Sequence, residues 1–454
     1  MAGIKDWIGI DKAVLFTLLG RGWSVGAGLF TIFMVTKFLS PELQGYYYTF
    51  NSLIALQIFV ELGLTYVVIQ FSSHEMAHLN WKNGGMVSGD AKAKRRLQSL
   101  LYFSLTWFGI AAVLMILVLI PSGIYFFNST KSVETIYETS KPWSLLVIFS
   151  SINLIVTVLG AVLEGCGKVA DIAVLRFMQS FTSVLAAWLV LWSGGGIYAL
   201  VANNAILALV GIIWLWFKYR HFFFDLFRIN KNTPGMDWRN EVWPFQWRIA
   251  LSWMSGFLIF QLFNPLLFAT HGAVVAGKMG MSLQIIAAMN GAAMAWISTK
   301  APLYGRLVAT SQREELDRVA LKGFIQSFIF LIIGVIVFGS ILYYLSYIGS
   351  RYAERVLPLN IFAMLGIVCL ANHIVFAQAA YLRAHKQEPF MGISILTGLV
   401  TASLAFALVP KLGAAGAVFS YSFSAIIISL IGGTFIFIKK RRQWKILQHR
   451  YSKI

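Results

Sequence analysis

The sequence predicts an all-α integral membrane protein of about 12 transmembrane helices, and three observations lead to this fold class. Hydrophobic residues make up 58% of the 454 residues and charged residues only 12%, whereas a soluble domain carries roughly 25% charged residues. The apolar residues recur in blocks of about twenty, the length of helix that crosses a ~30 Å hydrocarbon core. The lysines and arginines gather between these blocks, mostly on alternate sides.

Taken in chain order, the apolar blocks predict helices at 13–38, 44–72, 97–121, 142–165, 171–193, 196–217, 243–269, 272–299, 319–348, 358–383, 389–410 and 413–438. The polar stretch before the first block has no small-residue cleavage site, so we expect that block to remain as a helix. Pro265, which follows Asn264, is expected to kink or break the seventh helix.

The basic residues predict the orientation of the helices. Most lysines and arginines fall on the side that holds both termini, and the opposite side holds only Lys37, Lys131, Lys141, Arg351, Arg355 and Lys411. The positive-inside rule therefore predicts that both termini are cytoplasmic. Membrane topology accounts for the net charge of +19, so no nucleic-acid partner is expected. The basic tail is expected to lie against anionic membrane lipids.

Two halves of the chain echo each other at a near-constant offset. Arg21 enters the first helix as Arg248 enters the seventh, and Asp90 precedes the third helix as Asp317 precedes the ninth, both at an offset of 227 residues. Leu-Glu-Gly at 163–165 ends the fourth helix as Leu-Arg-Ala at 382–384 ends the tenth, at an offset of 219. Because six helices per repeat is an even number, we expect two parallel six-helix lobes related by a pseudo-two-fold axis along the membrane normal, which is a transporter architecture. The predicted organisation is an N-terminal lobe at 1–217, a cytoplasmic linker at 218–242, a C-terminal lobe at 243–438 and a basic tail at 439–454.

Several cations have no aqueous loop to hold them, and these are Arg21, Arg176, Arg248 and Lys278. A charge that faces lipid costs at least ~2.5–3.5 kcal/mol, so such groups usually face the bundle interior or a water-filled cavity. The repeat would place Arg21 and Arg248 across a central cavity of net positive charge, which suits an anionic substrate such as a phosphate or pyrophosphate. Arg176 and Arg248 lie about one turn inside cytoplasmic helix ends, so both also fit snorkelling to the interface. Lys37 and Lys278 either extend this lining or contact lipid headgroups.

Glu61 is the only carboxylate in the middle of a predicted helix. It lies ~16 Å into the second helix and Arg21 ~12 Å into the first, at 1.5 Å per residue. A structural counter-ion to Arg21 is therefore the favoured interpretation, and carriage of a coupling proton is the alternative. Coupling to H+ or Na+ stays open, and no other cofactor and no metal is expected.

Uncharged amides also occur inside the predicted helices, at Asn51, Gln57, Asn153, Asn203, Gln261, Asn264, Gln284 and Asn290. Hydrogen bonds between helices are the favoured use of such residues. Hydrogen bonds to sugar hydroxyls are the alternative.

Residues 74–78 read His-Glu-Met-Ala-His, a literal HExxH. On a helix this motif holds zinc between two imidazoles, with the glutamate as base. No third ligand follows at the metzincin spacing, because Trp81 stands there, and the chain contains no Asp-Gly dipeptide. A polar cap at the cytoplasmic end of the second helix is the favoured interpretation, and an intramembrane zinc protease is a distant alternative.

The chain resembles the bacterial polysaccharide flippases of O-antigen or capsule type, which belong to the multidrug/oligosaccharidyl-lipid/polysaccharide exporter superfamily. The resemblance spans essentially the whole chain. It is carried by Val-Val-Ile-Gln-Phe-Ser-Ser-His-Glu at 67–75, Ala-Gly-Lys-Met-Gly-Met-Ser-Leu at 276–283, Trp-Ile-Ser-Thr-Lys-Ala-Pro at 296–302, Leu-Ser-Pro-Glu at 39–42 and Leu-Glu-Gly at 163–165.

The resemblance implies movement of an undecaprenyl-pyrophosphate-linked oligosaccharide from the cytoplasmic to the periplasmic leaflet of the bacterial inner membrane, for surface polysaccharide synthesis. It assigns the pyrophosphate to Arg21 and Arg248, and it suggests the polymerase and chain-length components of the same pathway as partners. Related drug exporters often carry an acidic residue in the first helix, and this first helix has none. Glu61 therefore remains the candidate for ion coupling.

Two other classes of function stay open at this point. A multidrug or cation antiporter of the same fold would require an anionic cavity. An enzyme, either the zinc protease or a polysaccharide polymerase or acyltransferase, is the second class. A polymerase generally has a large periplasmic loop, and the longest loop predicted on that side is 122–141.

Overall fold

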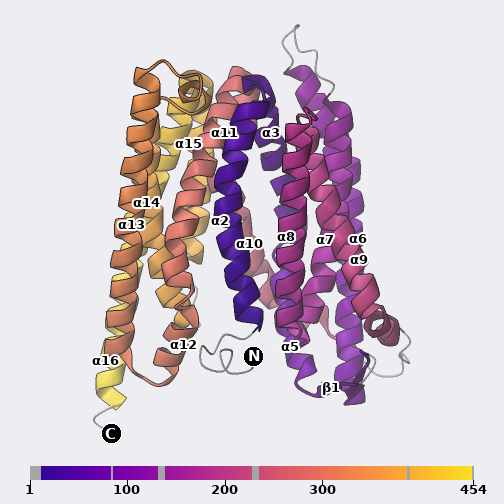
Figure 1. Ribbon diagram of the computed structural model, residues 1–454. Coiled ribbons are helices and arrows are strands. Elements are labelled where there is room, and N and C mark those ends of the chain that lie inside the picture. Colours follow the sequence, from indigo (N-terminus) through magenta and orange to yellow (C-terminus); the bar gives the residue numbers. More distant parts are fainter. Residues whose placement is uncertain (1–11, 83–84, 131–138, 228–234, 386–388, 452–454) are drawn as a thin grey trace, which may run out of the picture. The chain divides into compact units, whose positions relative to one another are not determined.

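The structure is a computed structural model that describes residues 12–82, 85–130, 139–227, 235–385 and 389–451, and these are almost entirely helical (Figure 1). Parts of the predicted linker, of the longest periplasmic loop with Lys131, and of the two termini lie outside the described residues. The described chain groups into two compact units. Unit 1 is Met1–Leu39 with Leu53–Met254, and unit 2 is Ser40–Ser52 with Ser255–Ile454.

Unit 1 is a helical bundle with one small hairpin at its edge. Its elements are α2 (Lys12–Phe38), η1 (Ala55–Gln57), α4 (Ile58–Glu61), α5 (Leu64–Met76), β1 (Leu79–Trp81), β2 (Val87–Gly89), α6 (Ala91–Ser129), α7 (Ser140–Gly165), α8 (Val169–Trp192), α9 (Tyr198–Phe227), η2 (Trp238–Val242) and α10 (Trp243–Phe260) as far as Met254. The two strands pair antiparallel, with Asn80 opposite Ser88. This hairpin was not predicted, because three-residue strands leave almost no period-two signal.

Unit 2 is built of helices alone within the described residues. Its elements are α3 (Pro41–Ile54) as far as Ser52, the end of α10, α11 (Phe263–Ser298), α12 (Ala301–Ala309), α13 (Arg313–Tyr347), η3 (Ala353–Arg355), α14 (Leu359–Ala384), α15 (Met391–Phe423), η4 (Ser424–Gly432) and α16 (Gly433–Tyr451). Compared with the predicted lobes, the grouping assigns 40–52 to unit 2 and 243–254 to unit 1. The lobe, linker and tail boundaries remain a prediction.

The membrane-spanning helices confirm the predicted fold class. Among the described residues, 9 helical runs are long and apolar enough to cross a membrane, or up to 10 when one bent pair is counted as a span. Two of the runs, Gln246–Val308 and Met391–Trp444, have 63 and 54 residues, which is more than twice the ~20 residues of a single span. Each is interrupted by a non-helical glycine, Gly272 or Gly413. The chain is therefore a multi-pass membrane protein with about twelve helices, as predicted.

The predicted break near Pro265 is present in the structure. Helix α10 ends at Phe260 and α11 begins at Phe263, so the break lies just before Asn264 and Pro265. A proline fits the first turn of a helix because the amide hydrogen that it lacks would have no helical partner there.

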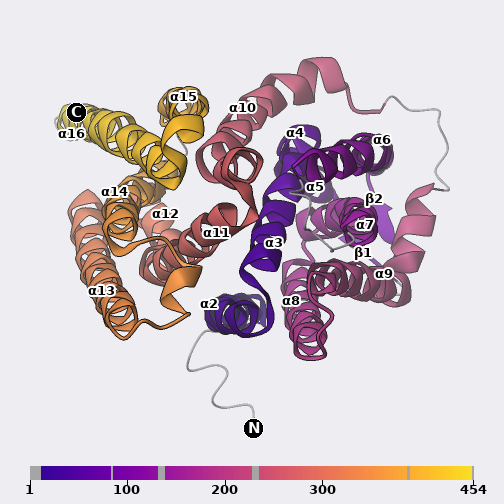
Figure 2. The same ribbon diagram turned by 90° about the horizontal axis from the view of Figure 1, so that it is seen from above.

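Close packing of α3 against α11 explains why 40–52 belongs to unit 2, and Figure 2 shows the two helices side by side. A Cβ atom added at Gly45 would overlap the backbone of Ala273, and one added at Gly277 would lie 2.9 Å from the backbone nitrogen of Gly45. Gln44 Nε2 donates 2.9 Å hydrogen bonds to the carbonyl oxygens of Gly277 and Arg355. The missing side chains allow two backbones to approach, as is common between membrane helices.

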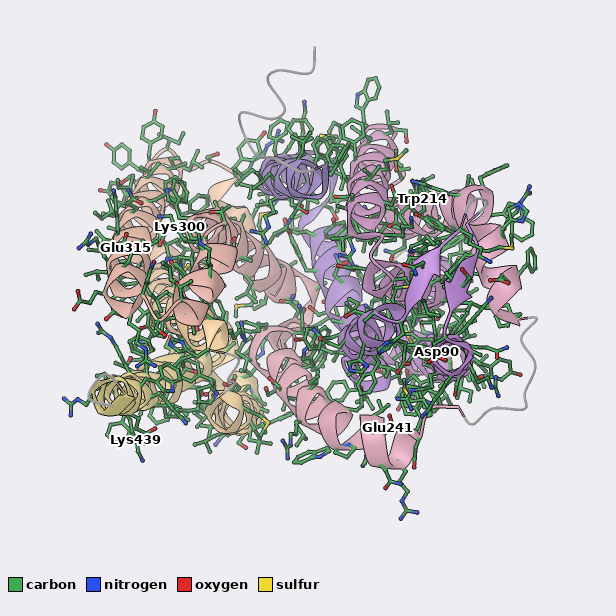
Figure 3. All side chains as sticks on the ribbon, turned by 90° about the horizontal axis from the view of Figure 1, so that it is seen from below. Asp90, Trp214, Glu241, Lys300, Glu315 and Lys439 are labelled. Carbon is green, nitrogen blue, oxygen red and sulfur yellow. The ribbon has the colours of Figure 1, made fainter. Side chains whose placement is uncertain are left out.

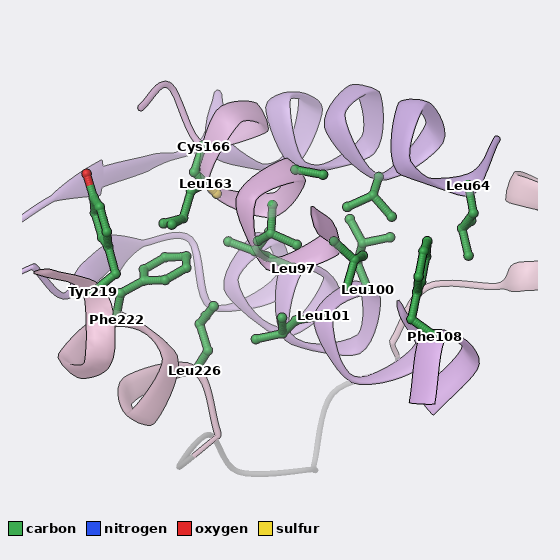
Figure 4. Close-up of a cluster of buried hydrophobic side chains, with 14 of the residues drawn as sticks. Leu64, Leu97, Leu100, Leu101, Phe108, Leu163, Cys166, Tyr219, Phe222 and Leu226 are labelled. Carbon is green, nitrogen blue, oxygen red and sulfur yellow. The ribbon is translucent and has the colours of Figure 1, made fainter. Parts of the chain in front are cut away.

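The core of unit 1 lies between α5, α6, α7 and α9 (Figure 4). Leu97, Leu100 and Phe108 of α6 are fully buried there, together with Leu163 of α7 and Phe222 of α9. These side chains hold the four helices together, from the helix ends that were predicted to be cytoplasmic toward the middle of α6.

Polar side chains tie those same helix ends together within each unit. In unit 1, Arg96 at the start of α6 bridges Glu75 at the end of α5 (2.8 Å) and Glu241 of η2 (2.5 Å). In unit 2, Asp317 at the start of α13 accepts from Tyr381 at the end of α14 (2.7 Å) and pairs with Arg441 of α16 (2.5 Å). Glu241 of unit 1 and Lys439 of unit 2 are among the residues labelled in Figure 3.

Candidate functional site

Helix α4 ends at Glu61, where the second predicted helix is broken. Leu62 and Gly63 both have positive φ, 51° and 66°, a conformation that costs little only for glycine. Trp107 Nε1 donates to the carbonyl oxygen of Val60 (2.9 Å), and Gln246 Nε2 donates to that of Leu62 (2.6 Å). Backbone carbonyls freed by a helix break must find partners at membrane depth, and these two side chains supply them.

Glu61 itself is half-buried beside this break. Its Oε1 accepts a 2.6 Å hydrogen bond from Thr65 Oγ1, one turn further along the chain. A carboxylate next to a broken helix is a common setting for ion binding in transporters. Thr65 is the partner that the structure gives Glu61, and the pairing with Arg21 stays a prediction.

Arg21 and Arg248 both lie on membrane-spanning helices, and both are exposed. Arg21 is on α2 and Arg248 on α10, and both helix segments belong to unit 1. The Arg248 guanidinium lies 5.6 Å from the ring centroid of Trp247. Arg248 lies two residues inside its membrane-spanning run, so its long side chain can also reach the membrane interface. A guanidinium deeper in the membrane usually faces the bundle interior or a water-filled cavity, because facing lipid costs a few kcal/mol.

The remaining predicted cations have different surroundings. Arg176 of α8 pairs with Glu164 at the end of α7 (2.5 Å), so its charge is neutralised within unit 1. Lys37, at the end of α2, lies over the rings of Phe33 and Phe38, at 5.6 and 5.4 Å from their centroids. Lys278 is half-buried on α11, next to the contact that Gly277 makes with α3. The structure therefore gives Arg176 a structural partner, whereas substrate contact by all five cations stays a prediction.

The HExxH motif does not have the geometry of a zinc site. Helix α5 ends at Met76, so His78 lies in the following turn and the two imidazoles do not share a helix face. Glu75 is buried and bound by Arg96, whereas His74 and His78 are exposed. Among the described residues no group of three or more His, Cys, Asp or Glu side chains could hold a metal ion. Glu75 instead joins α5 to α6.

Arg96 also changes the pKa of Glu241, the second carboxylate to which it is bound. The hydrogen bond from Arg96 lowers the pKa of Glu241, which lies outside the membrane-spanning helices. A carboxyl group whose pKa is lowered on folding stabilises the folded protein at pH values above the ordinary pKa of the group. This stabilisation is lost as the pH falls through the lowered pKa.

Unit 2 contains a cavity of about 500 Å³ that is lined mainly by uncharged polar and aromatic side chains. Five of the amides singled out in the sequence line it, and they are Asn51, Gln261, Asn264, Gln284 and Asn290. Asn372 of α14 lines it as well, as do Tyr48 of α3 and Tyr421 of α15. Unlike these, Asn153 and Asn203 of unit 1 hold helices together, through Asn204 and Ser183.

A fully buried histidine supports one wall of this cavity. His373 of α14 lies 3.0 Å from Asn290 Oδ1 through Nδ1 and 2.9 Å from Ser327 Oγ through Nε2. Sequence reasoning missed His373 and Asn372. The available signal was an Asn-His pair within the otherwise apolar helix 358–383, where a polar group needs an internal partner.

Comparison with solved structures finds the same fold in transporters of the MOP superfamily. An inward-facing multidrug resistance MATE family transporter matches 96% of this chain and 99% of its own, with 15% identity and a TM-score of 0.67. The MATE multidrug transporter DinF-BH matches 94% of both chains, with 14% identity and a TM-score of 0.62. The lipid II flippase MurJ matches 94% of this chain and 87% of its own, with 13% identity and a TM-score of 0.58.

The chain thus has the fold seen in these membrane transporters and in this flippase. No family model and no curated protein matches it. Because a fold hosts more than one activity, the substrate has to be argued from the side chains.

Proposed function

We propose that this protein flips an undecaprenyl-pyrophosphate-linked oligosaccharide from the cytoplasmic to the periplasmic leaflet of the bacterial inner membrane, for the synthesis of a surface polysaccharide. The observation that carries the proposal is the pair of exposed guanidinium groups, Arg21 and Arg248, on membrane-spanning helices of a transporter fold. Guanidinium groups bind phosphate oxygens in a bidentate manner. A pyrophosphate that crosses the membrane would pass the two membrane-spanning helices that carry Arg21 and Arg248.

A cation antiporter of the same fold is the second candidate. The observation that favours it is Glu61, a half-buried carboxylate beside a broken helix. Glu61 is our candidate for ion coupling in either case, with H+ or Na+ as the ion, and a structural counter-ion to Arg21 is its other proposed role. Arg21 and Arg248 favour an anionic cargo, because a cationic drug would be repelled by them. The polymerase and chain-length proteins of the same pathway are the partners that we expect.

The test is to replace each arginine in the native host. Arg21→Ala and Arg248→Ala are each expected to lower surface polysaccharide at least about tenfold, because losing a charge-assisted bidentate contact costs more than about 1.4 kcal/mol. The measurement is the amount of surface polysaccharide at equal protein level in the membrane. Arg21→Lys is expected to give an intermediate amount of surface polysaccharide, because lysine keeps the positive charge but cannot form the bidentate contact of a guanidinium group.

The matched control is Arg318→Ala. Arg318 is exposed in the second turn of α13, where it pairs with the partly exposed Glu315, and its loss should leave polysaccharide unchanged. Normal polysaccharide in both Arg21→Ala and Arg248→Ala cells would refute the proposed function. Loss of drug resistance together with intact polysaccharide would favour the antiporter.

A further inference from the structure

We infer that the cavity of unit 2 is a binding site for a neutral, hydroxyl-rich ring, the size of one sugar residue. The cavity measures about 500 Å³, which lies within the usual range of small-molecule sites, ~300–1,000 Å³. No lysine, arginine, aspartate or glutamate is among its lining residues within the described chain. A site for a free ion or for a charged drug would be expected to carry a compensating charge.

Two buried polar atoms in this lining have no hydrogen-bond partner, the hydroxyl of Tyr48 and Oδ1 of Asn264. Both residues are more than nine-tenths buried. An unpaired buried polar group costs about 1–3 kcal/mol, so native proteins rarely keep one without a reason. Here both atoms border the same cavity, where a bound ligand would supply their missing hydrogen-bond partners.

Three internal hydrogen bonds leave defined atoms of Asn264, Tyr421 and Asn290 for a ligand. Asn264 Nδ2 donates to Ser52 Oγ (3.0 Å), which leaves Oδ1 as an acceptor. Asn372 Nδ2 donates to the hydroxyl of Tyr421 (2.8 Å), which leaves the Tyr421 hydrogen as a donor. Asn290 Oδ1 is engaged by His373, so its Nδ2 is the donor that remains.

The lining therefore offers both donors and acceptors. Sugar hydroxyls both donate and accept, whereas a metal cation takes acceptors only and an anion takes donors only. Phe260, Phe376 and the ring of Tyr421 add apolar surface for the C–H face of a sugar ring. The assignment of this ring to the oligosaccharide cargo rests on the proposed function.

Local packing shows that the cavity is part of the architecture of unit 2. Gly280 of α11 lies against the Tyr48 ring, and a Cβ atom there would overlap that ring. His373 acts as a positioning residue, because it touches Asn290 and Ser327 and does not line the cavity itself.

The decisive variant is Tyr48→Phe, which removes an unpaired hydroxyl and no hydrogen bond within the described structure. Binding is measured by saturation-transfer NMR on the full chain in nanodiscs, with a panel of free hexoses and N-acetylhexosamines as probes. At least one probe is expected to bind, and Tyr48→Phe is expected to weaken it about tenfold. Thermal unfolding of Tyr48→Phe should be unchanged or slightly improved in the absence of sugar.

Gln284→Leu is the second variant, because Gln284 lines the cavity on a different helix. Tyr304→Phe is the matched control, a buried tyrosine of the same unit outside the cavity. If the wild-type chain binds none of the sugars, the cavity holds only water and the inference is overturned. Equal binding by Tyr48→Phe and wild type would overturn it too, as would competition by the cation tetraphenylphosphonium.

The two proposals fail separately. Arg21→Ala is expected to bind the free sugar as wild type does, because Arg21 belongs to unit 1, while it loses surface polysaccharide. Sugar binding that depends on Tyr48 together with normal polysaccharide in the arginine variants would sink the proposed function and leave the cavity assignment standing. The reverse pattern would sink the cavity assignment alone.

Discussion

At the scale of single residues, several charged side chains of this protein are paired at the helix ends. Arg96 illustrates this pairing, since one guanidinium neutralises a buried glutamate and an exposed one. Two neutral polar atoms, in contrast, have no hydrogen-bond partner: the hydroxyl of Tyr48 and Oδ1 of Asn264, which border the same cavity. Paired side chains such as Arg96 thus stabilise the fold, whereas the two unpaired atoms are the ones that we assign to ligand binding.

Replacing Arg96 tests the structural role of Glu75. Arg96→Leu leaves the buried Glu75 carboxylate without its cation, and we expect a loss of about 3 kcal/mol in the free energy of unfolding. The measurement is denaturant unfolding of the detergent-solubilised protein. Arg318→Leu, which breaks an exposed pair with Glu315, should cost less than about 1 kcal/mol.

The double variant Arg96→Leu/Glu75→Gln should recover part of the lost stability, because the uncompensated buried charge is gone. If Arg96→Leu proves as stable as wild type, Glu75 is not held as the structure indicates, and the HExxH motif would again need an explanation.

At the scale of elements, glycines decide which helices meet. Gly45 and Gly277 let the backbones of α3 and α11 touch, and this contact assigns the first part of α3 to unit 2. Gly63 has a different role, because its positive φ ends α4 beside Glu61. A Cβ atom at Gly63 would also lie 2.5 Å from a methyl carbon of Ile249. Gly277, within the motif at 276–283 that carries the family resemblance, therefore serves the packing of α11 against α3.

Gly45→Ala tests the contact of α3 with α11. The added methyl group would overlap the backbone of Ala273, and overpacking against a rigid neighbour costs about 1–3 kcal/mol or more. We expect a lower unfolding temperature and a smaller monodisperse fraction on size-exclusion chromatography.

Gly26→Ala on α2 is the matched control, since nothing lies within 4 Å of its added Cβ. Alanine should stabilise that helix slightly, by up to about 1 kcal/mol. Equal unfolding temperatures for Gly45→Ala and Gly26→Ala would contradict the close approach.

At the scale of the whole molecule, the helix ends predicted to be cytoplasmic meet within each unit. Glu75, Arg96 and Glu241 do so in unit 1, and Asp317, Tyr381 and Arg441 do so in unit 2. In each unit, charged side chains therefore meet at the helix ends that the positive-inside rule assigns to the cytoplasm. That this end faces the cytoplasm remains a prediction from the positive-inside rule.

Topology reporters check that prediction. Alkaline phosphatase, which is active only outside the cytoplasm, should be active when fused after Gly349 and inactive when fused after Gly167. Gly349 follows α13, on the side with few basic residues, and Gly167 follows α7 beside Lys168. A fluorescent protein that folds in the cytoplasm should be bright when fused after Ile454. The reverse pattern of activities would invert the assigned orientation, and with it the direction of transport.

Sequence alone predicted the class of fold, the order and approximate limits of the helices, and the break before Pro265. It could do so because hydrophobic length and proline geometry act locally along the chain. It also singled out five amides of one cavity, although it favoured helix contacts as their use. The β1–β2 hairpin and the positive φ at Leu62 left no readable pattern.

Only the tertiary structure decided which polar groups find a partner. Arg176 is paired with Glu164 and Glu75 with Arg96, whereas the Tyr48 hydroxyl and Asn264 Oδ1 have no partner. Each of these outcomes depends on how separate helices pack against one another, and no spacing along the sequence encodes such a meeting. Charge and length are properties of the chain, but satisfaction of a buried polar atom is a property of the packing around it.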